Sequence, residues 1–159
     1  MNALVVYYPL GEIIKVAQKI DFLLNKNNIN SKLFEAVFET EMDLKKQFKH
    51  EKELNLLNKI HRIKKIDLLI IGTPIISFTS VPAINVFIRN LPKIKNKKIV
   101  LFATGIGLPG NAIKKMSSLL SMKEAIVIDS QVFSSIFEFD SKKMVEVEKF
   151  FERFLQKTK

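Results

Sequence analysis

The sequence predicts an α/β fold in three layers, a five-stranded parallel sheet with helices on both faces. A short apolar run, a loop and a segment of helical periodicity follow one another five times between residue 2 and the C-terminus. The apolar runs, about four to eight residues long, lack polar alternation, as in strands buried on both faces. Because ligands of such folds bind at the carboxyl ends of the strands, the loops there are the candidate site.

The five predicted strands are rich in Val, Ile, Leu and Phe. They cover residues 3–7, 32–37, 67–72, 98–103 and 125–129. Only the second alternates in part, with Lys32, Glu35 and Glu39 among apolar neighbours, which favours an edge strand.

Apolar residues at helical spacing predict helices after the first, third, fourth and fifth strands. Pro82 and Pro109 stand at or just before the third and fourth helices, where a missing N–H costs little. Residues 42–64 are predicted as one long polar helix with an interrupted middle. The apolar residues that carry this helical pattern are Ile13, Val16, Ala17, Ile20, Leu23, Leu24, Ile84, Phe87, Ile88, Leu91, Ala112, Ile113, Met116, Leu119, Leu120, Met144, Val147, Phe151, Phe154 and Leu155.

Length and composition predict a single domain over residues 1–159. The chain is 47% hydrophobic, enough for one buried core. It has no cysteine, which excludes disulfides and thiol chemistry. No apolar stretch approaches the roughly 20 residues that span a bilayer, and no signal peptide is recognisable. We therefore expect a cytoplasmic protein with no membrane partner.

The formal charge of +10 raises the question of an acidic partner. The densest basic groups stand directly before strands, which places them at the amino ends, opposite the ligand edge. There they are able to dock an acidic protein, although an ordinary solvated face is the simpler interpretation. Nucleic acid is disfavoured, because the Phe residues follow core periodicity and do not interleave with lysines. The two groups are Lys59, Arg62, Lys64 and Lys65, and Lys93, Lys95, Lys97 and Lys98.

Three loops carry the functional signal: residues 8–13, 73–80 and 104–110. With their strands, above all Gly72-Thr73-Pro74 and the glycines after Thr104, they resemble the flavodoxin family, including its flavin-dependent reductases, over nearly the whole chain. The resemblance implies the strand order 2-1-3-4-5 and an FMN cofactor. It also implies a redox protein or a small-molecule electron acceptor as partner, and a homodimer is compatible with it.

In this resemblance the first loop holds the FMN phosphate, and the loops after strands three and four hold the isoalloxazine ring. FMN itself supplies the redox chemistry, so no catalytic side chain and no metal ligand is predicted. The implied cofactor contacts are Tyr8, Pro9, Leu10, Gly11, Glu12, Ile13, Thr73, Pro74, Ile75, Ile76, Ser77, Phe78, Thr104, Gly105, Ile106 and Gly107.

The phosphate loop departs from the family pattern, which resembles Ser/Thr-x-Thr-Gly-Asn-Thr. Gly11 keeps the glycine, but Leu10 and Ile13 replace hydroxyl residues, Tyr8 stands in for the first, and Glu12 replaces the asparagine. Each lost hydrogen bond to the phosphate costs about 1.5–3 kcal/mol, and a carboxylate nearby adds roughly 1–4 kcal/mol of repulsion. Glu12 is then a local anion at the helix start. Lys15, one turn on, partly offsets it if it reaches back, although an ordinary helix-surface lysine is the favoured interpretation.

The ring site is better preserved. Phe78 is the stacking candidate, backed by Ile76, and Gly105 and Gly107 allow close approach of the backbone. Packing against a neighbouring loop or a partner subunit explains Phe78 equally well. Two threonine hydroxyls, on Thr73 and Thr104, are candidate contacts to the ring edge.

Alternatives remain. The pattern Gly105-x-Gly107-x-x-Gly110, with Asp129 as ribose ligand, matches a dinucleotide fingerprint, but Pro109 and the shortage of following strands disfavour it. Two histidines, at positions 50 and 61, lack metal spacing. Residues 132–139 are rich in apolar side chains and predict an added edge strand or a subunit contact, with closure over a flavin as the less favoured alternative. Finally, the altered phosphate loop allows a domain that has lost FMN and serves as a protein-binding or assembly module.

Overall fold

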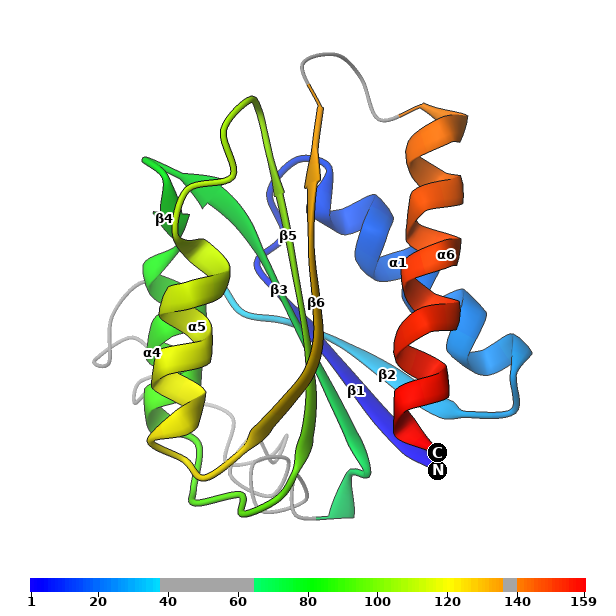
Figure 1. The fold of residues 1–159 in the computed structure, drawn as a ribbon, viewed down its shortest axis with the longest axis vertical. Coiled ribbons are helices and arrows are strands. Elements are labelled where there is room, and N and C mark those ends of the chain that lie inside the picture. Colours follow the sequence, from blue (N-terminus) through cyan, green and yellow to red (C-terminus); the bar gives the residue numbers. More distant parts are fainter. Residues whose placement is uncertain (38–64, 136–139) are drawn as a thin grey trace.

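The computed structural model describes residues 1–37, 65–135 and 140–159. Five parallel strands form the sheet in the order β2-β1-β3-β5-β6, which is the predicted order (Figure 1). A short strand, β4, pairs antiparallel with the end of β3. The elements are β1 (Asn2–Tyr7), α1 (Ile13–Lys26), β2 (Asn30–Glu35), β3 (Leu68–Ile76), β4 (Thr79–Ser80), α4 (Pro82–Asn90), β5 (Lys98–Gly105), α5 (Ala112–Ser121), β6 (Ile126–Ser134) and α6 (Ser141–Thr158).

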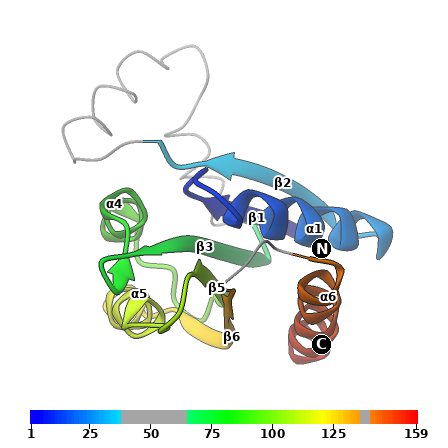
Figure 2. The ribbon, with the colours of Figure 1, turned by 90° about the horizontal axis from the view of Figure 1, so that it is seen from above.

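Helices cover both faces of the sheet, α4 and α5 on one side and α1 and α6 on the other (Figure 2). Consecutive strand residues face opposite sides, as the pleat requires. Val6, Ile71 and Leu101 pack with α4 and α5. Tyr7, Ile70 and Phe102 pack with α1 and α6. The central strands are therefore apolar throughout, which explains why their sequences show no alternation.

The bounds of β2, β3 and β6 differ most from prediction, whereas β1 and β5 each differ at one end, by one and two residues. β2 runs Asn30–Glu35 at the edge of the sheet, so its edge position is confirmed while its range is shifted by two residues. β3 continues beyond residue 72 to Ile76, because β4 folds back and pairs with it. β6 continues beyond Asp129 to Ser134, because β5 pairs with it as far as Gly105. The predicted helix at 42–64 and residues 136–139 lie outside the described residues.

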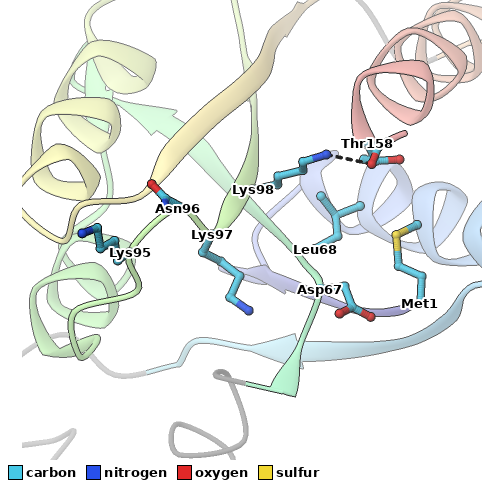
Figure 3. Close-up of a pocket in the computed structure, with 8 residues that line it drawn as sticks. All are labelled: Met1, Asp67, Leu68, Lys95, Asn96, Lys97, Lys98 and Thr158. Carbon is cyan, nitrogen blue, oxygen red and sulfur yellow. Dashed lines mark hydrogen bonds between the residues drawn. The ribbon is translucent and has the colours of Figure 1, made fainter.

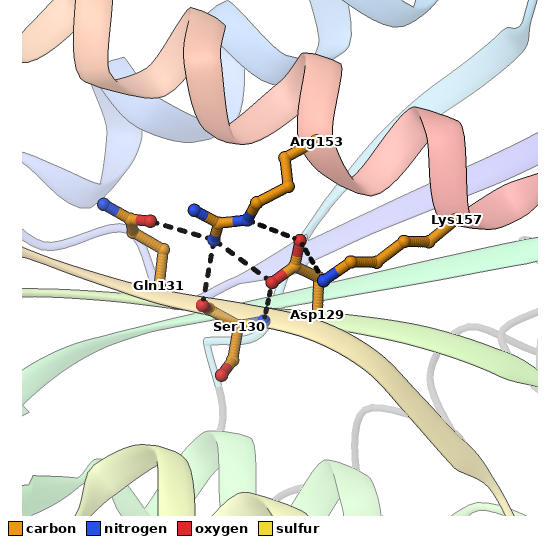
Figure 4. Close-up of polar contacts among 5 residues, drawn as sticks. All are labelled: Asp129, Ser130, Gln131, Arg153 and Lys157. Carbon is orange, nitrogen blue, oxygen red and sulfur yellow. Dashed lines mark hydrogen bonds and ion pairs between the residues drawn. The ribbon is translucent and has the colours of Figure 1, made fainter.

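Asp129 lies in the middle of β6, and its carboxylate fastens α6 to the sheet (Figure 4). Arg153 Nε donates to Oδ2 at 2.8 Å and Nη2 to Oδ1 at 3.1 Å, and Lys157 Nζ lies 3.1 Å from Oδ2. Arg153 also donates to the carbonyl of Ser130 and the amide oxygen of Gln131. Asp129 is thus committed to a structural ion pair, which counts against a role as a ribose ligand.

We expect Asp129→Asn to destabilise the fold by about 1–2 kcal/mol, because the two cations that it pairs with are half-exposed and partly screened. Burial alone would raise the pKa of Asp129, but hydrogen bonds from Arg153, Lys157 and the Ser130 N–H outweigh it, and the pKa is lowered. The carboxylate therefore stabilises the fold above its unfolded-state pKa, and this is lost as the pH falls through the folded-state value.

Urea denaturation between about pH 3 and pH 7 measures both effects. The difference between the wild type and Asp129→Asn should be largest near neutral pH and shrink from about pH 4 downward. Glu148→Gln, which removes an exposed carboxylate 2.5 Å from Lys19, is the matched control and should change the midpoint little. A difference that stays constant with pH would contradict the assignment.

Candidate functional site

Three connections meet at the carboxyl edge of the sheet, the upper edge in Figure 1. They are the β1–α1 loop, the hairpin between β3 and β4, and the β5–α5 loop. Register brings them together, since Tyr7 lies opposite Gly72 and Pro74 opposite Thr104. The topology thus gathers the three predicted site segments at one edge, as the sequence led us to expect.

The β3–β4 hairpin turns on two residues, Ser77 and Phe78, with φ angles of 51° and 63°. Positive φ at both positions is the geometry of a type I′ turn, which usually holds Asn-Gly. A bulky aromatic in this conformation is unfavourable by roughly 1–2 kcal/mol. The Phe78 side chain is nevertheless 64% exposed. The turn therefore presents an aromatic ring to solvent at a conformational cost.

We expect Phe78→Gly to leave the stability unchanged or raise it by up to about 1 kcal/mol, because glycine adopts positive φ freely. Phe22→Gly is the matched control, since Phe22 is 59% exposed but lies within α1, where glycine costs about 1 kcal/mol. Thermal and urea unfolding of both variants check this. Equal destabilisation by the two substitutions would show that the turn carries no strain.

The β5–α5 loop holds the hairpin in place. The Asn111 N–H donates to the carbonyl oxygen of Phe78 at 2.8 Å. Gly110 lies so close that a Cβ there would stand 2.1 Å from the same oxygen, and a Cβ on Gly105 would meet the Ile75 side chain at 3.1 Å. The two predicted ring loops therefore form one packed unit. It includes Gly110, which lay in the predicted loop but not among the implied cofactor contacts, and Asn111, which lies just beyond that loop.

The residues predicted to contact the flavin ring fall into two groups, one exposed to solvent and one buried. Ile76, Phe78 and Ile106 are 45%, 64% and 84% exposed, and Leu108, which was not predicted, is 73% exposed. Thr73 is buried instead, with its hydroxyl donating to the Pro74 carbonyl and accepting from the Val81 N–H. Thr104 is also buried. Residues 73–76 belong to β3, where the sequence had placed a loop. The large exposed side chains of this unit are therefore apolar, with Ser77 and Asn111 as exposed polar residues beside them.

The β1–α1 loop shows what replaces the hydroxyl residues of the family pattern. Ile13 is fully buried in the core, while Leu10 is 49% exposed. Glu12 occupies the N-cap position of α1 but its side chain makes no capping hydrogen bond. Lys15 Nζ reaches back to it, 3.0 Å from Oε2 and 3.3 Å from Oε1, with hydrogen-bond geometry only to Oε1. The loop thus carries its own anion and counterion.

Tyr7, the last residue of β1, offers no acid or base to this edge. It is buried, and its hydroxyl donates to Glu35 Oε1 at 2.9 Å. Burial, the hydrogen bond and the charges of Glu35 and Asp21 raise the pKa of Tyr7 to about 12. The phenol therefore stays protonated at neutral pH and ties the end of β1 to β2.

The opposite, amino edge of the sheet holds a pocket of about 310 Å³ lined in part by Lys95, Lys97 and Lys98 (Figure 3). Lys98 Nζ donates to the Thr158 carbonyl at 2.8 Å, and Lys97 Nζ donates to the carbonyl of Ile66. The predicted position of this basic group is confirmed. The first group, apart from Lys65, lies outside the described residues. The three lysine head groups diverge in Figure 3 and do not converge on one ligand, while Lys97 and Lys98 fasten chain segments.

The described ranges contain no group of three or more His, Asp or Glu side chains placed to hold a metal ion. In the same ranges no helix is long and apolar enough to cross a membrane. Both histidines of the sequence lie outside these ranges.

Comparison with known proteins identifies the fold. No protein-family model and no curated protein sequence matches the chain. Among solved structures, an archaeal flavodoxin is similar with a TM-score of 0.68 at 12% identity over 99% of both chains. A flavodoxin from Streptococcus pneumoniae gives 0.68 at 13% identity, also over 99% of both. An azoreductase from Bacillus anthracis gives 0.67 at 15% identity, over 99% of this chain and 98% of that one. The fold is flavodoxin-like.

The residues present fit one half of an FMN molecule. At the ring end, Gly107 has open space where a Cβ would stand and Phe78 presents an exposed aromatic face. At the phosphate end, Glu12 and two aliphatic residues, Leu10 and Ile13, stand in the loop where the family pattern has polar, uncharged side chains. The side chains at this edge are compatible with a flavin ring and unfavourable for a phosphate.

Proposed function

We propose that this chain is a flavin-binding electron-transfer or oxidoreductase protein, with the isoalloxazine ring held between the β3–β4 hairpin and the β5–α5 loop. The observation that carries the proposal is the packed unit of these two loops, joined by the hydrogen bond from Asn111 to Phe78. A hairpin fixed in this way keeps an aromatic side chain outward despite its unfavourable φ. The flavodoxin-like fold supports the proposal, and FMN is the flavin that the family resemblance implies.

The bound flavin would supply the redox chemistry, and the chain would position it. Phe78 would stack on the ring, and the backbone of Gly105 and Gly107 would approach its polar edge, since neither carries a side chain to hinder contact. The apolar side chains of Ile76 and Ile106 would exclude water beside it. None of these residues titrates near neutral pH, so the site offers shape and polarity and no general acid or base.

Flavin fluorescence titration of the full chain tests the proposal, with both FMN and riboflavin as ligands. Quenching that saturates with either flavin at micromolar concentration, and that weakens about ten-fold in Phe78→Ala, is the expected result. Absence of quenching by both flavins up to high micromolar concentration would refute it.

The second candidate function is a flavodoxin-like module without flavin that binds protein. It is favoured by the exposed apolar side chains of Phe78, Ile106 and Leu108, which lie in two loops that carry no charged residue between positions 73 and 88 or between 103 and 113. Leu10, in the neighbouring β1–α1 loop, is also exposed. Such surfaces commonly contact another protein. If no flavin binds, a change in oligomeric state on Ile106→Ser and Leu108→Ser, measured by light scattering, would favour self-association through this surface.

A further inference from the structure

We infer that this site selects a flavin without a phosphate group, such as riboflavin, over FMN. The inference rests on the proposed flavin site and concerns which flavin fills it. It is carried by Glu12, whose carboxylate lies at the N-terminus of α1, in the segment that the family pattern uses for the phosphate.

The Glu12 carboxylate already supplies the negative charge that the N-terminus of α1 would otherwise stabilise in a ligand. The N-terminus of a helix carries about half a positive charge and stabilises one nearby anion. Here that anion is part of the chain, held by Lys15 at 3.0 Å, and α1 has no other acidic residue in its first turn. Lys15 is paired with Glu12 as well. The positive helix end and the Lys15 ammonium therefore both have an anionic partner before any ligand binds.

Apart from Lys15, the side chains of this loop offer a phosphate a single hydrogen-bond donor, the hydroxyl of Tyr8. Leu10 and Ile13 have no polar side-chain atoms, and Ile13, the first residue of α1, is fully buried in the core. The backbone N–H of Leu10 donates to the Tyr8 carbonyl at 2.9 Å, so this donor is already used within the loop. A ribityl chain that ends in a neutral hydroxyl makes no such demand, because it can exchange hydrogen bonds with water.

For FMN binding, the repulsion between Glu12 and the phosphate at close range outweighs the attraction by the net positive charge of the protein. Two unit charges about 4 Å apart alter an equilibrium roughly five-fold even in bulk water, and more where protein displaces water. The phosphate brings nearly two negative charges at neutral pH. The formal charge of +10 attracts FMN from a distance, but salt screens that attraction beyond about 8 Å at physiological ionic strength. Glu12 therefore decides the preference at close range.

Titration of the wild-type chain with riboflavin and FMN, followed by flavin fluorescence at physiological ionic strength, is the test. We expect riboflavin to bind at least ~5-fold more tightly than FMN. In Glu12→Gln, which keeps the side-chain shape and removes the charge, FMN affinity should rise about ten-fold while riboflavin affinity stays within roughly two-fold. Unchanged riboflavin binding also reports that the variant is folded.

Glu152→Gln is the matched control, because Glu152 is an exposed glutamate on α6 and its loss changes the net charge by the same amount. It should leave the ratio of the two affinities unchanged. FMN binding as tightly as riboflavin in the wild type, or an unchanged ratio in Glu12→Gln, would overturn this inference and leave the flavin site standing. Failure of both flavins to bind would refute the proposed function and this inference together.

Discussion

Gly72→Ala, which adds one methyl group, is expected to destabilise the protein by about 3 kcal/mol. A Cβ at this position in β3 would stand 2.2 Å from Cζ of Phe102 on β5. Phe102 is fully buried between α1 and α6. Packed interiors do not yield to an extra methyl group without displaced side chains or backbone, which costs typically about 1–3 kcal/mol and occasionally more.

Urea denaturation measures this effect, and a second substitution shows its cause. In the Gly72→Ala background, Phe102→Leu should restore part of the lost stability, since the shorter side chain vacates the space that the new methyl group needs. Phe102→Leu alone should destabilise the protein, because it leaves a cavity in a well-packed core. Additive losses in the double variant would mean that the two residues do not compete for space.

Gly110→Ala is expected to destabilise the protein by about 2 kcal/mol and to release the β3–β4 hairpin. Two effects combine. The φ angle of 56° costs a residue with a Cβ roughly 1 kcal/mol, and the Cβ would stand 2.1 Å from the Phe78 carbonyl oxygen. That contact displaces the carbonyl from the Asn111 N–H, which removes a further hydrogen bond worth about 1 kcal/mol.

Gly107→Ala separates the two effects. Gly107 also has a positive φ, 76°, but nothing lies within 4 Å of where its Cβ would stand. It should show the conformational cost alone, about 1 kcal/mol. Hydrogen exchange of the Asn111 amide should accelerate in Gly110→Ala and not in Gly107→Ala. Equal behaviour of the two variants would show that the loops are not coupled through Gly110.

The strands themselves were predictable because buried parallel strands are continuous apolar runs, clearest at β1, β3 and β5, whereas their order came from the resemblance to the flavodoxin family. The extent of β3 was not predictable, because Thr73-Pro74-Ile75-Ile76 resembles a loop by composition and becomes a strand only through pairing with β4. A type I′ turn made of Ser77 and Phe78 carries none of the usual Asn or Gly residues, so its signal was missing from the sequence.

The site was predictable to the level of its loops and not of its contacts. That Glu12 replaces a neutral residue is visible in the sequence. Its ion pair with Lys15 is not, because the same spacing suits an ordinary helix-surface lysine, which was the favoured interpretation. The hydrogen bond between Asn111 and Phe78 joins residues 33 positions apart and depends on where two loops end in space. The burial of the Thr73 hydroxyl depends on the hairpin and was equally invisible.

The bond from Lys98 to the Thr158 carbonyl has a practical meaning for handling the molecule. It ties the last turn of α6 to the start of β5, and Met1 lines the same pocket (Figure 3). Both ends of the described chain therefore emerge on the side remote from the three loops. A surface or a fused domain attached at either end would leave the loops facing open solution, which gives titrations on immobilised protein unobstructed access to them.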